Sequence, residues 1–160
     1  AAKDWEKIQE KLVAETPRTN DEIKAMFPET LAGMKRSSFT VGEAQMMGMN
    51  SGQATYSNDD GKSVAVSIMD GAGETGASMV AMYAITLAME TEQQTENGYT
   101  KTTKFDGNRA TVSENKYDDT FNSEITTLVS NRFLVSLKGS GLSLNELEKV
   151  YNEINLKSLK

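Results

Sequence analysis

The sequence predicts an α+β fold in which an antiparallel sheet of about seven strands has helices packed on its faces. Apolar residues recur at helical spacing at both ends of the chain and once near its middle, and between these segments they alternate with a period of two. The last alternating segments follow one another without a helical pattern, so they are expected to pair through turns as antiparallel strands. The expected order is two helices, three strands, a helix, four strands and a helix, in a single α+β domain over residues 1–160.

The first two elements are predicted to be helices. An apolar stripe among Lys and Glu indicates a first helix that ends before Pro17. Thr19 and Glu22 have the spacing of a capping box, so a second, short helix is expected to begin there and to end before Pro28. The stripe of the first helix consists of Trp5, Ile8, Leu12 and Val13.

From Ser37 onward the period changes to two, and three strands are expected. The turn sequence Asn-Asp-Asp-Gly at residues 58–61 separates the second strand from the third. The alternating residues are Phe39 and Val41, then Ala54 and Tyr56, then Val64, Val66 and Ile68.

Residues 75–89 contain no charged side chain. This segment is shorter than the roughly 20 residues that a membrane-spanning helix needs. It is also too apolar for the surface of a protein, because a surface helix normally carries a polar face. The sequence therefore predicts a largely buried helix.

Four strands and a final helix are expected after this segment. Asp106-Gly107 and Ser130-Asn131 are two-residue turn signals, and residues 115–119 indicate a longer turn. Ser143 and Glu146 again have capping-box spacing, at the start of the last helix. The four strands are predicted at residues 99–105, 109–113, 121–129 and 132–138.

The chain of 160 residues contains no His and no Cys. Serine or cysteine nucleophiles activated by His, thiol redox chemistry and zinc or haem held by these ligands are therefore excluded. Ser113 and Lys116 have Ser-x-x-Lys spacing but lie at a strand end, and the paired carboxylates at residues 59–60 and 118–119 lie in turn sequences. We therefore expect a protein that is not an enzyme and that uses no cofactor.

The net charge of −6 is concentrated in one part of the chain. Residues 37–100 hold one base, Lys62, against eight carboxylates, which gives −7 for this segment. Binding to nucleic acid or to an anionic membrane needs clustered Lys and Arg. The expected partner is another protein, with no nucleic acid and no integral membrane segment, and the oligomeric state stays open.

Gly71, Gly73 and Gly76 form a G-x-G-x-x-G sequence between a predicted strand and the apolar helix. This pattern leaves open a nucleotide-binding enzyme that holds phosphate at the helix N-terminus. Two observations oppose it: the preceding strand includes polar residues, and Asp70 and Glu74 would repel phosphate. A glycine loop without ligand is the favoured interpretation.

Met46, Met47 and Met49 form a cluster in a connection between strands. Thioethers are soft ligands, so one alternative is a Cu(I) site. Methionine also fills irregular gaps in cores, so a second hypothesis is that the cluster serves packing. Because methionine forms adaptable contact surfaces, a third hypothesis is a partner-binding surface that also includes Asp70 and Glu74.

The element order resembles that of the PsbP-like group of small α+β proteins, which implies an accessory or scaffold role. Residues 29–36 (ETLAGMKR) and 64–70 (VAVSIMD) resemble segments of a set of exported bacterial proteins. This resemblance implies an exported bacterial accessory or protein-binding domain, periplasmic, envelope-associated or extracellular. The sequence starts at Ala1 without Met or an apolar leader. This start is expected for a mature exported protein after removal of its signal peptide, and equally for a sequence trimmed at its N-terminus.

Overall fold

The computed structural model describes residues 2–154 and residue 156, with side chains from Asp4 onward. Ala1, the expected mature N-terminus, lies outside the described residues. Before the middle of the chain lie α1 (Ala2–Ala14), α2 (Asn20–Lys24), β1 (Thr30–Leu31), β2 (Met34–Val41), the 3-10 helix η1 (Gln45–Met47), β3 (Asn50–Ser57) and β4 (Ser63–Asp70). After it lie α3 (Glu74–Ala88), β5 (Glu92–Gln94), β6 (Gly98–Phe105), β7 (Asn108–Tyr117), β8 (Thr120–Val129), β9 (Phe133–Ser140) and α4 (Leu144–Glu153).

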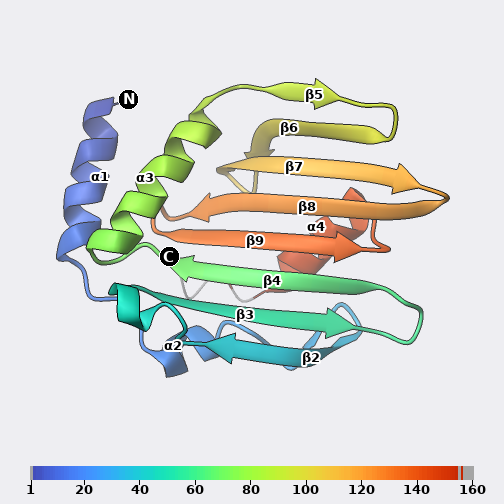
Figure 1. Ribbon diagram of the computed structural model, residues 1–160, viewed down its shortest axis with the longest axis horizontal. Helices are drawn as coiled ribbons and strands as arrows, with labels where there is room; N and C mark the ends of the chain where they lie inside the picture. The colour runs from blue at the N-terminus through green and yellow to red at the C-terminus, as the bar shows by residue number, and fades with distance from the viewer. Residues whose placement is uncertain (1, 155, 157–160) are drawn as a thin grey trace.

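All strands belong to one antiparallel sheet, in the order β1-β2-β3-β4-β9-β8-β7-β6-β5 (Figure 1). Each half of the sheet is a meander of strands that are consecutive in the sequence. The two halves are joined by the ladder between β4 and β9, which runs from Ser63 opposite Ser140 to Asp70 opposite Phe133.

One face of the sheet carries the main core. Because side chains alternate across a strand, Val64, Val66 and Ile68 of β4 point to the same face as Leu137 of β9. α4 and α2 cover this face, and Figure 1 shows α4 behind the sheet. The largest side chains in this core with almost no exposure include Tyr56, Tyr151, Phe133, Ile23 and Leu147.

The opposite face is covered only near one end of the strands, where α1 and α3 lie (Figure 1). Met69, Leu128 and Leu134 point to these helices and form a second, smaller core with them. The rest of this face is polar. One row of directly paired residues crosses seven strands on it, from Thr40 through Gln53, Ser67, Ser136, Thr126 and Thr111 to Thr102.

The structure confirms the α+β class and the antiparallel sheet, but the expected number of about seven strands is wrong. The described residues form nine strands, four before α3 and five after it, and η1 interrupts the first group. β1 has two residues, too few to show alternation, and β5 is an exposed edge strand that holds only Glu and Gln. Neither strand has the apolar period of two on which the prediction relied.

The expected longer turn at residues 115–119 is also wrong. β7 continues to Tyr117 and β8 begins at Thr120, so only Asp118 and Asp119 form the turn. Their φ angles are 47° and 64°, as a tight type I′ hairpin requires at both central residues. Asp tolerates this left-handed conformation, which explains why two carboxylates stand side by side here.

Candidate functional site

The inner face of α3 packs on the end of the sheet and against α1. Ala77, Val80 and Leu87 of α3 are buried in the second core, with Leu12 of α1 and Leu128 of β8. At the end of α3, the guanidinium of Arg109 donates a hydrogen bond of 3.1 Å to the carbonyl oxygen of Leu87. This bond satisfies a carbonyl that the last turn of a helix leaves without an intrahelical partner.

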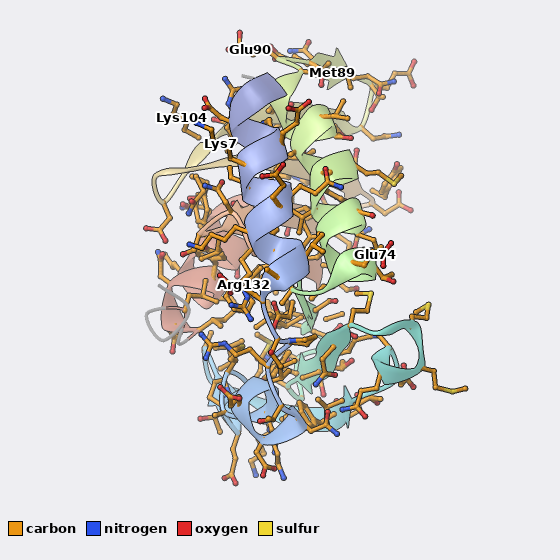
Figure 2. The ribbon with its side chains drawn as sticks, turned by 90° about the vertical axis from the view of Figure 1, so that its left-hand side faces the viewer. Lys7, Glu74, Met89, Glu90, Lys104 and Arg132 are labelled. Carbon is orange, nitrogen blue, oxygen red and sulfur yellow. The ribbon has the colours of Figure 1, made fainter. Side chains whose placement is uncertain are left out.

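The outer face of α3 is exposed, which contradicts the expectation of a largely buried helix. The exposed fractions are 43% for Met79, 71% for Met82, 66% for Ile85 and 52% for Met89, the C-cap residue. The expectation failed because α1 and the sheet cover only one side of α3, and nothing in the described chain covers the other side. Figure 2 shows the two helices side by side, with Glu74 and Met89 at opposite ends of α3.

The hydroxyl groups on this outer face are already bonded within α3. Ser78 Oγ donates to the carbonyl oxygen of Glu74 at 3.1 Å, and Thr86 Oγ1 donates to the carbonyl oxygen of Met82 at 3.4 Å. A partner that covered the face would therefore leave neither hydroxyl without a hydrogen bond, so the cost of burying these two polar groups is small.

η1 extends this apolar surface beyond the N-terminal end of α3 (Figure 2). The two elements are in close contact, since a Cβ placed on Gly73, the N-cap of α3, would lie 2.8 Å from the carbonyl oxygen of Gly48. Met46 of η1 is 99% exposed and Met47 is 59% exposed. We define the methionine surface as Met46 and Met47 of η1 together with Met79, Met82, Ile85 and Met89 of α3.

The three methionines that the sequence analysis grouped together do not share one environment. Met49 is 4% exposed and packs in the second core with Ala77 and Val80, whereas Met46 and Met47 point to solvent. A Cu(I) site that used all three thioethers would require Met49 to leave the core.

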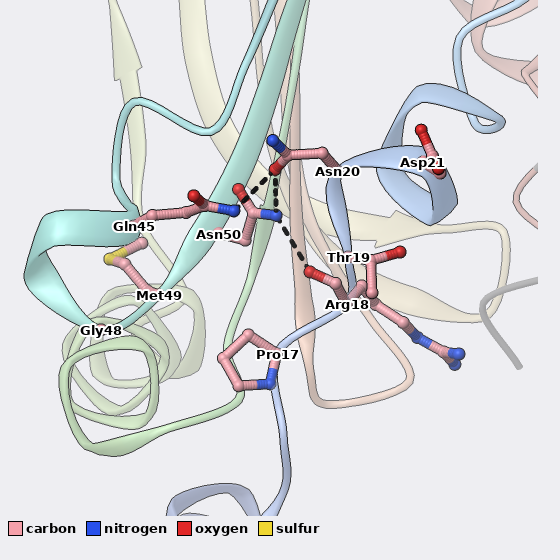
Figure 3. A pocket seen from close by; sticks show the side chains of 9 residues that line it. All are labelled: Pro17, Arg18, Thr19, Asn20, Asp21, Gln45, Gly48, Met49 and Asn50. Atoms are coloured by element: carbon pink, nitrogen blue, oxygen red, sulfur yellow. Dashed lines mark hydrogen bonds between the residues drawn. The ribbon is translucent and has the colours of Figure 1, made fainter.

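A network of side-chain amides fixes η1 to the rest of the fold (Figure 3). Asn20 Oδ1 accepts hydrogen bonds from Gln45 Nε2 and Asn50 Nδ2, both at 2.9 Å, and Asn50 Nδ2 also donates to the carbonyl oxygen of Arg18 at 2.9 Å. An open cavity of about 610 Å³ lies beside these groups and is also lined by Gly48. Since these amide groups bond to one another, we interpret the network as the support that holds η1 in place beside α3.

Asp70, a candidate partner-binding residue, is completely buried. Arg132 Nε donates to its Oδ1 at 2.7 Å and Nη2 to its Oδ2 at 3.0 Å, and the backbone N–H of Arg18 donates to Oδ2 at 2.7 Å. The hydrogen bond to Asp70 raises the pKa of the Arg132 guanidinium above its ordinary value. Arg132 also pairs with Glu15, so the cluster anchors the connection between α1 and α2 to the sheet. Asp70 has a structural role in this arrangement, and its carboxylate does not reach a partner.

The backbone N–H groups at the start of the glycine loop are used inside the fold. Gly71 N donates to the carbonyl oxygen of Arg132 at 2.8 Å, Gly73 N donates to that of Leu12 at 2.8 Å, and Ala72 N donates to Asp70 Oδ1 at 3.0 Å. A Cβ on Gly76 would lie 2.8 Å from the carbonyl oxygen of Asp70, so this glycine permits a close turn between β4 and α3. These contacts account for the glycines by packing, and they use the N–H groups of residues 71–73 inside the fold.

The remaining candidate residues are spread over the surface. Glu74 is exposed in the first turn of α3, where its negative charge interacts favourably with the helix dipole. Asp59 and Asp60 follow Asn58, whose Oδ1 accepts a hydrogen bond from the N–H of Asp60 at 3.0 Å, as expected for a turn. Among the described residues, no three His, Cys, Asp or Glu side chains are grouped so that they could hold a metal ion.

Comparison of the chain with family models, with curated proteins and with solved structures gave no match. None of the helices within residues 2–154 is both long enough and apolar enough to cross a membrane.

Sequence reasoning found Met46, Met47 and Glu74 of this region but missed the four exposed side chains of α3. A signal was present, because the absence of charge over residues 75–89 extends to every side of the helix. The absence of charge predicts a buried helix, but the sequence alone does not indicate which side of that helix the fold leaves uncovered.

Proposed function

We propose that this protein is a non-catalytic binding module that docks another protein on the methionine surface. The observation that carries the proposal is the outer face of α3, where Met82 and Ile85 are about two-thirds exposed and no charge interrupts the helix. Large apolar side chains grouped on a surface are typical of interaction sites. Methionine suits such a site because its flexible thioether side chain adapts to different partner shapes.

The other hypotheses have less support. A Cu(I) site lacks a third exposed methionine within η1. Nucleotide binding is opposed by the exposed carboxylate of Glu74 at the N-terminus of α3 and by the use of the N–H groups of residues 71–73 inside the fold. Export to the envelope or the extracellular space remains a proposal from the resemblance to exported bacterial proteins.

Site-specific photo-crosslinking in the source cells tests the proposed function. A photoreactive amino acid replaces Ile85 on α3, and a matched control replaces Lys149, an exposed residue on the outer side of α4. We expect a discrete crosslinked protein from position 85 and none from position 149. Absence of a product at position 85, or the same products from both positions, would contradict the proposed function.

A further inference from the structure

Resting on the proposed function, we infer that the partner segment that binds the methionine surface is an amphipathic helix with Lys or Arg near both ends of its apolar face. The inference has two independent parts. The spacing of the exposed side chains on α3 specifies a helix, and the charges at the ends of α3 specify basic residues near the two ends of that helix.

The exposed side chains of α3 are spaced as the seam of a coiled coil. Ser78, Met82, Ile85 and Met89 follow one another at intervals of four, three and four residues. Positions with this alternation form the a and d rows of a heptad, which interlock with a second helix. A lone apolar residue or an irregular patch would not specify a helix, whereas this seam continues over three turns.

The residues beside the seam allow a second helix to approach closely. Ala81 and Ala88 lie along one side of it and Met79 and Thr86 along the other. Small side chains next to the seam reduce the distance between two packed helices toward the lower end of the usual range of about 8–10 Å. The flexible side chain of Met79 can fill the space that a partner leaves on its side.

The charges around the seam are negative. Glu74 lies at the start of α3 and Glu90 just beyond its end, and both carboxylates are exposed. Arg109 lies 3.8 Å from Glu90 and also bonds the end of α3, so the charge of Glu90 is partly compensated, whereas Glu74 makes no ion pair with the described residues. Lys7 and Lys104 lie on the α1 side of the helix pair in Figure 2, away from the outer face of α3.

The same charges disfavour two other occupants. In an antiparallel pair of two copies of α3, Glu74 of each copy would lie near Glu90 of the other, so like charges would meet at both ends. A lipid surface is disfavoured because helices that lie on membranes carry Lys and Arg beside their apolar face, and α3 carries none. A helix with basic residues near both ends of its apolar face places opposite charges at these positions.

A binding titration with three synthetic helical peptides of about 21 residues tests the inference, since α3 is about 22 Å long. The first peptide has an apolar a/d seam and Lys at the e and g positions of its first and last turns. The second has Glu at those positions, and the third has the composition of the first in scrambled order. Each is titrated into the whole protein at low and high salt, and binding is followed by fluorescence anisotropy.

We expect micromolar binding of the Lys peptide, affinity at least about tenfold lower for the Glu peptide, and a smaller difference between the two at high salt. The protein variant Ile85→Glu should lose binding, and Lys149→Glu on the outer side of α4 is its matched control. Both substitutions are at exposed positions, and the unfolding midpoint in urea verifies that both variants are folded.

Three outcomes would overturn the inference. Equal affinity for the Lys and Glu peptides would contradict the role of charge. Binding of the scrambled peptide, or no binding of any of the three peptides, would contradict recognition through a helical seam. Self-association of the protein in sedimentation, abolished by Ile85→Glu, would assign the surface to a second copy. A crosslinked partner at position 85 together with no peptide binding would refute only this inference, whereas absence of the crosslink refutes the proposed function itself.

Discussion

α3 and α4 pack on opposite faces of the same sheet, and they differ in what their outer sides expose. The buried stripe of α4 consists of Leu144, Leu147, Val150 and Tyr151, and its outer positions are polar or charged. α3 has a comparable buried stripe but exposes Met82 and Ile85. Burial on the sheet explains why each helix forms, but it does not explain the apolar outer side of α3. The difference between the two outer sides is the feature on which the proposed docking surface rests.

The largest effect on stability is expected from the ion pair between Asp70 and Arg132, which lies on the side of the fold where α1 and α3 pack. Arg132→Met would leave the buried carboxylate of Asp70 without its cation, which should lower the free energy of unfolding by about 3–5 kcal/mol. Urea denaturation measures this change, and hydrogen exchange should show a greater loss of protection in α1 than in α4. Lys138→Met in β9, the strand that follows Arg132, is the control, because the side chain of Lys138 is 69% exposed and the change should be within about 0.5 kcal/mol. Equal losses for the two variants would show that the Asp70 cluster does not stabilise this side.

Truncation of one apolar side chain on each helix tests the comparison directly. Leu147→Ala on α4 should cost about 2–5 kcal/mol because Leu147 is completely buried. Ile85→Ala on α3 should change stability by no more than about 0.5 kcal/mol, since the side chain is exposed and Ala favours a helix. A cost for Ile85→Ala similar to that for Leu147→Ala would mean that the outer side of α3 is already buried in solution.

The phenol of Tyr151 on α4 is expected to affect stability only at high pH. Burial raises its pKa to about 12, from an ordinary value of 10.0. Because the folded state binds this proton more tightly than the unfolded state, the phenol contributes to the free energy of unfolding. This contribution is complete below pH 10 and is lost as the pH rises toward 12. At pH 11 the unfolding free energy of the natural protein should have fallen by about 1 kcal/mol more than that of Tyr151→Phe.

At pH 7 the same substitution should be nearly neutral, within about 0.5 kcal/mol. The Tyr151 hydroxyl is buried and has no hydrogen-bond partner among the described residues, so its removal breaks no bond. Urea unfolding at both pH values measures the two effects. Parallel pH profiles for the two proteins would show that Tyr151 is not the group that titrates.

The smallest effect concerns the cap of α4. The hydrogen bond from Lys62 to Glu146 lowers the pKa of this carboxyl below its ordinary value, and the bond to Ser143 adds to this. The contribution of the Glu146 carboxylate to the free energy of unfolding is therefore present above the ordinary pKa of Glu, and it is lost as the pH falls through the lowered pKa. Glu146→Gln should cost a few tenths to about 1 kcal/mol at pH 7 and almost nothing at pH 3. A cost that is the same at both pH values would indicate that the charge of Glu146 has no role.

The parts of the structure that could be predicted depend on neighbouring residues. Both capping boxes, at Thr19 with Glu22 and at Ser143 with Glu146, form as the sequence indicates, because each requires residues only three positions apart. The contact between Asp70 and Arg132 joins residues 62 positions apart and has no local signal.

The candidate site was predictable in part for the same reason. The sequence shows that residues 75–89 carry no charge and that Met46 and Met47 form part of an unusual cluster. The exposed side of α3 depends on where α1 and β8 lie, and the burial of Met49 depends on the position of η1. These are properties of the assembled fold, so composition alone assigned the outer side of α3 to the core.

The pairing of β4 with β9 has a consequence for the synthesis of this protein. β4 ends at Asp70, but its second neighbour is complete only at Ser140. At about 5–20 residues per second, a ribosome takes roughly 4–14 s to make the chain between them. During this time β4 remains an open edge, next to an α3 that has no sheet to cover its inner side. The nascent chain thus exposes an open strand edge and its most apolar helix together, so its yield in cells should depend on chaperones that bind within these seconds.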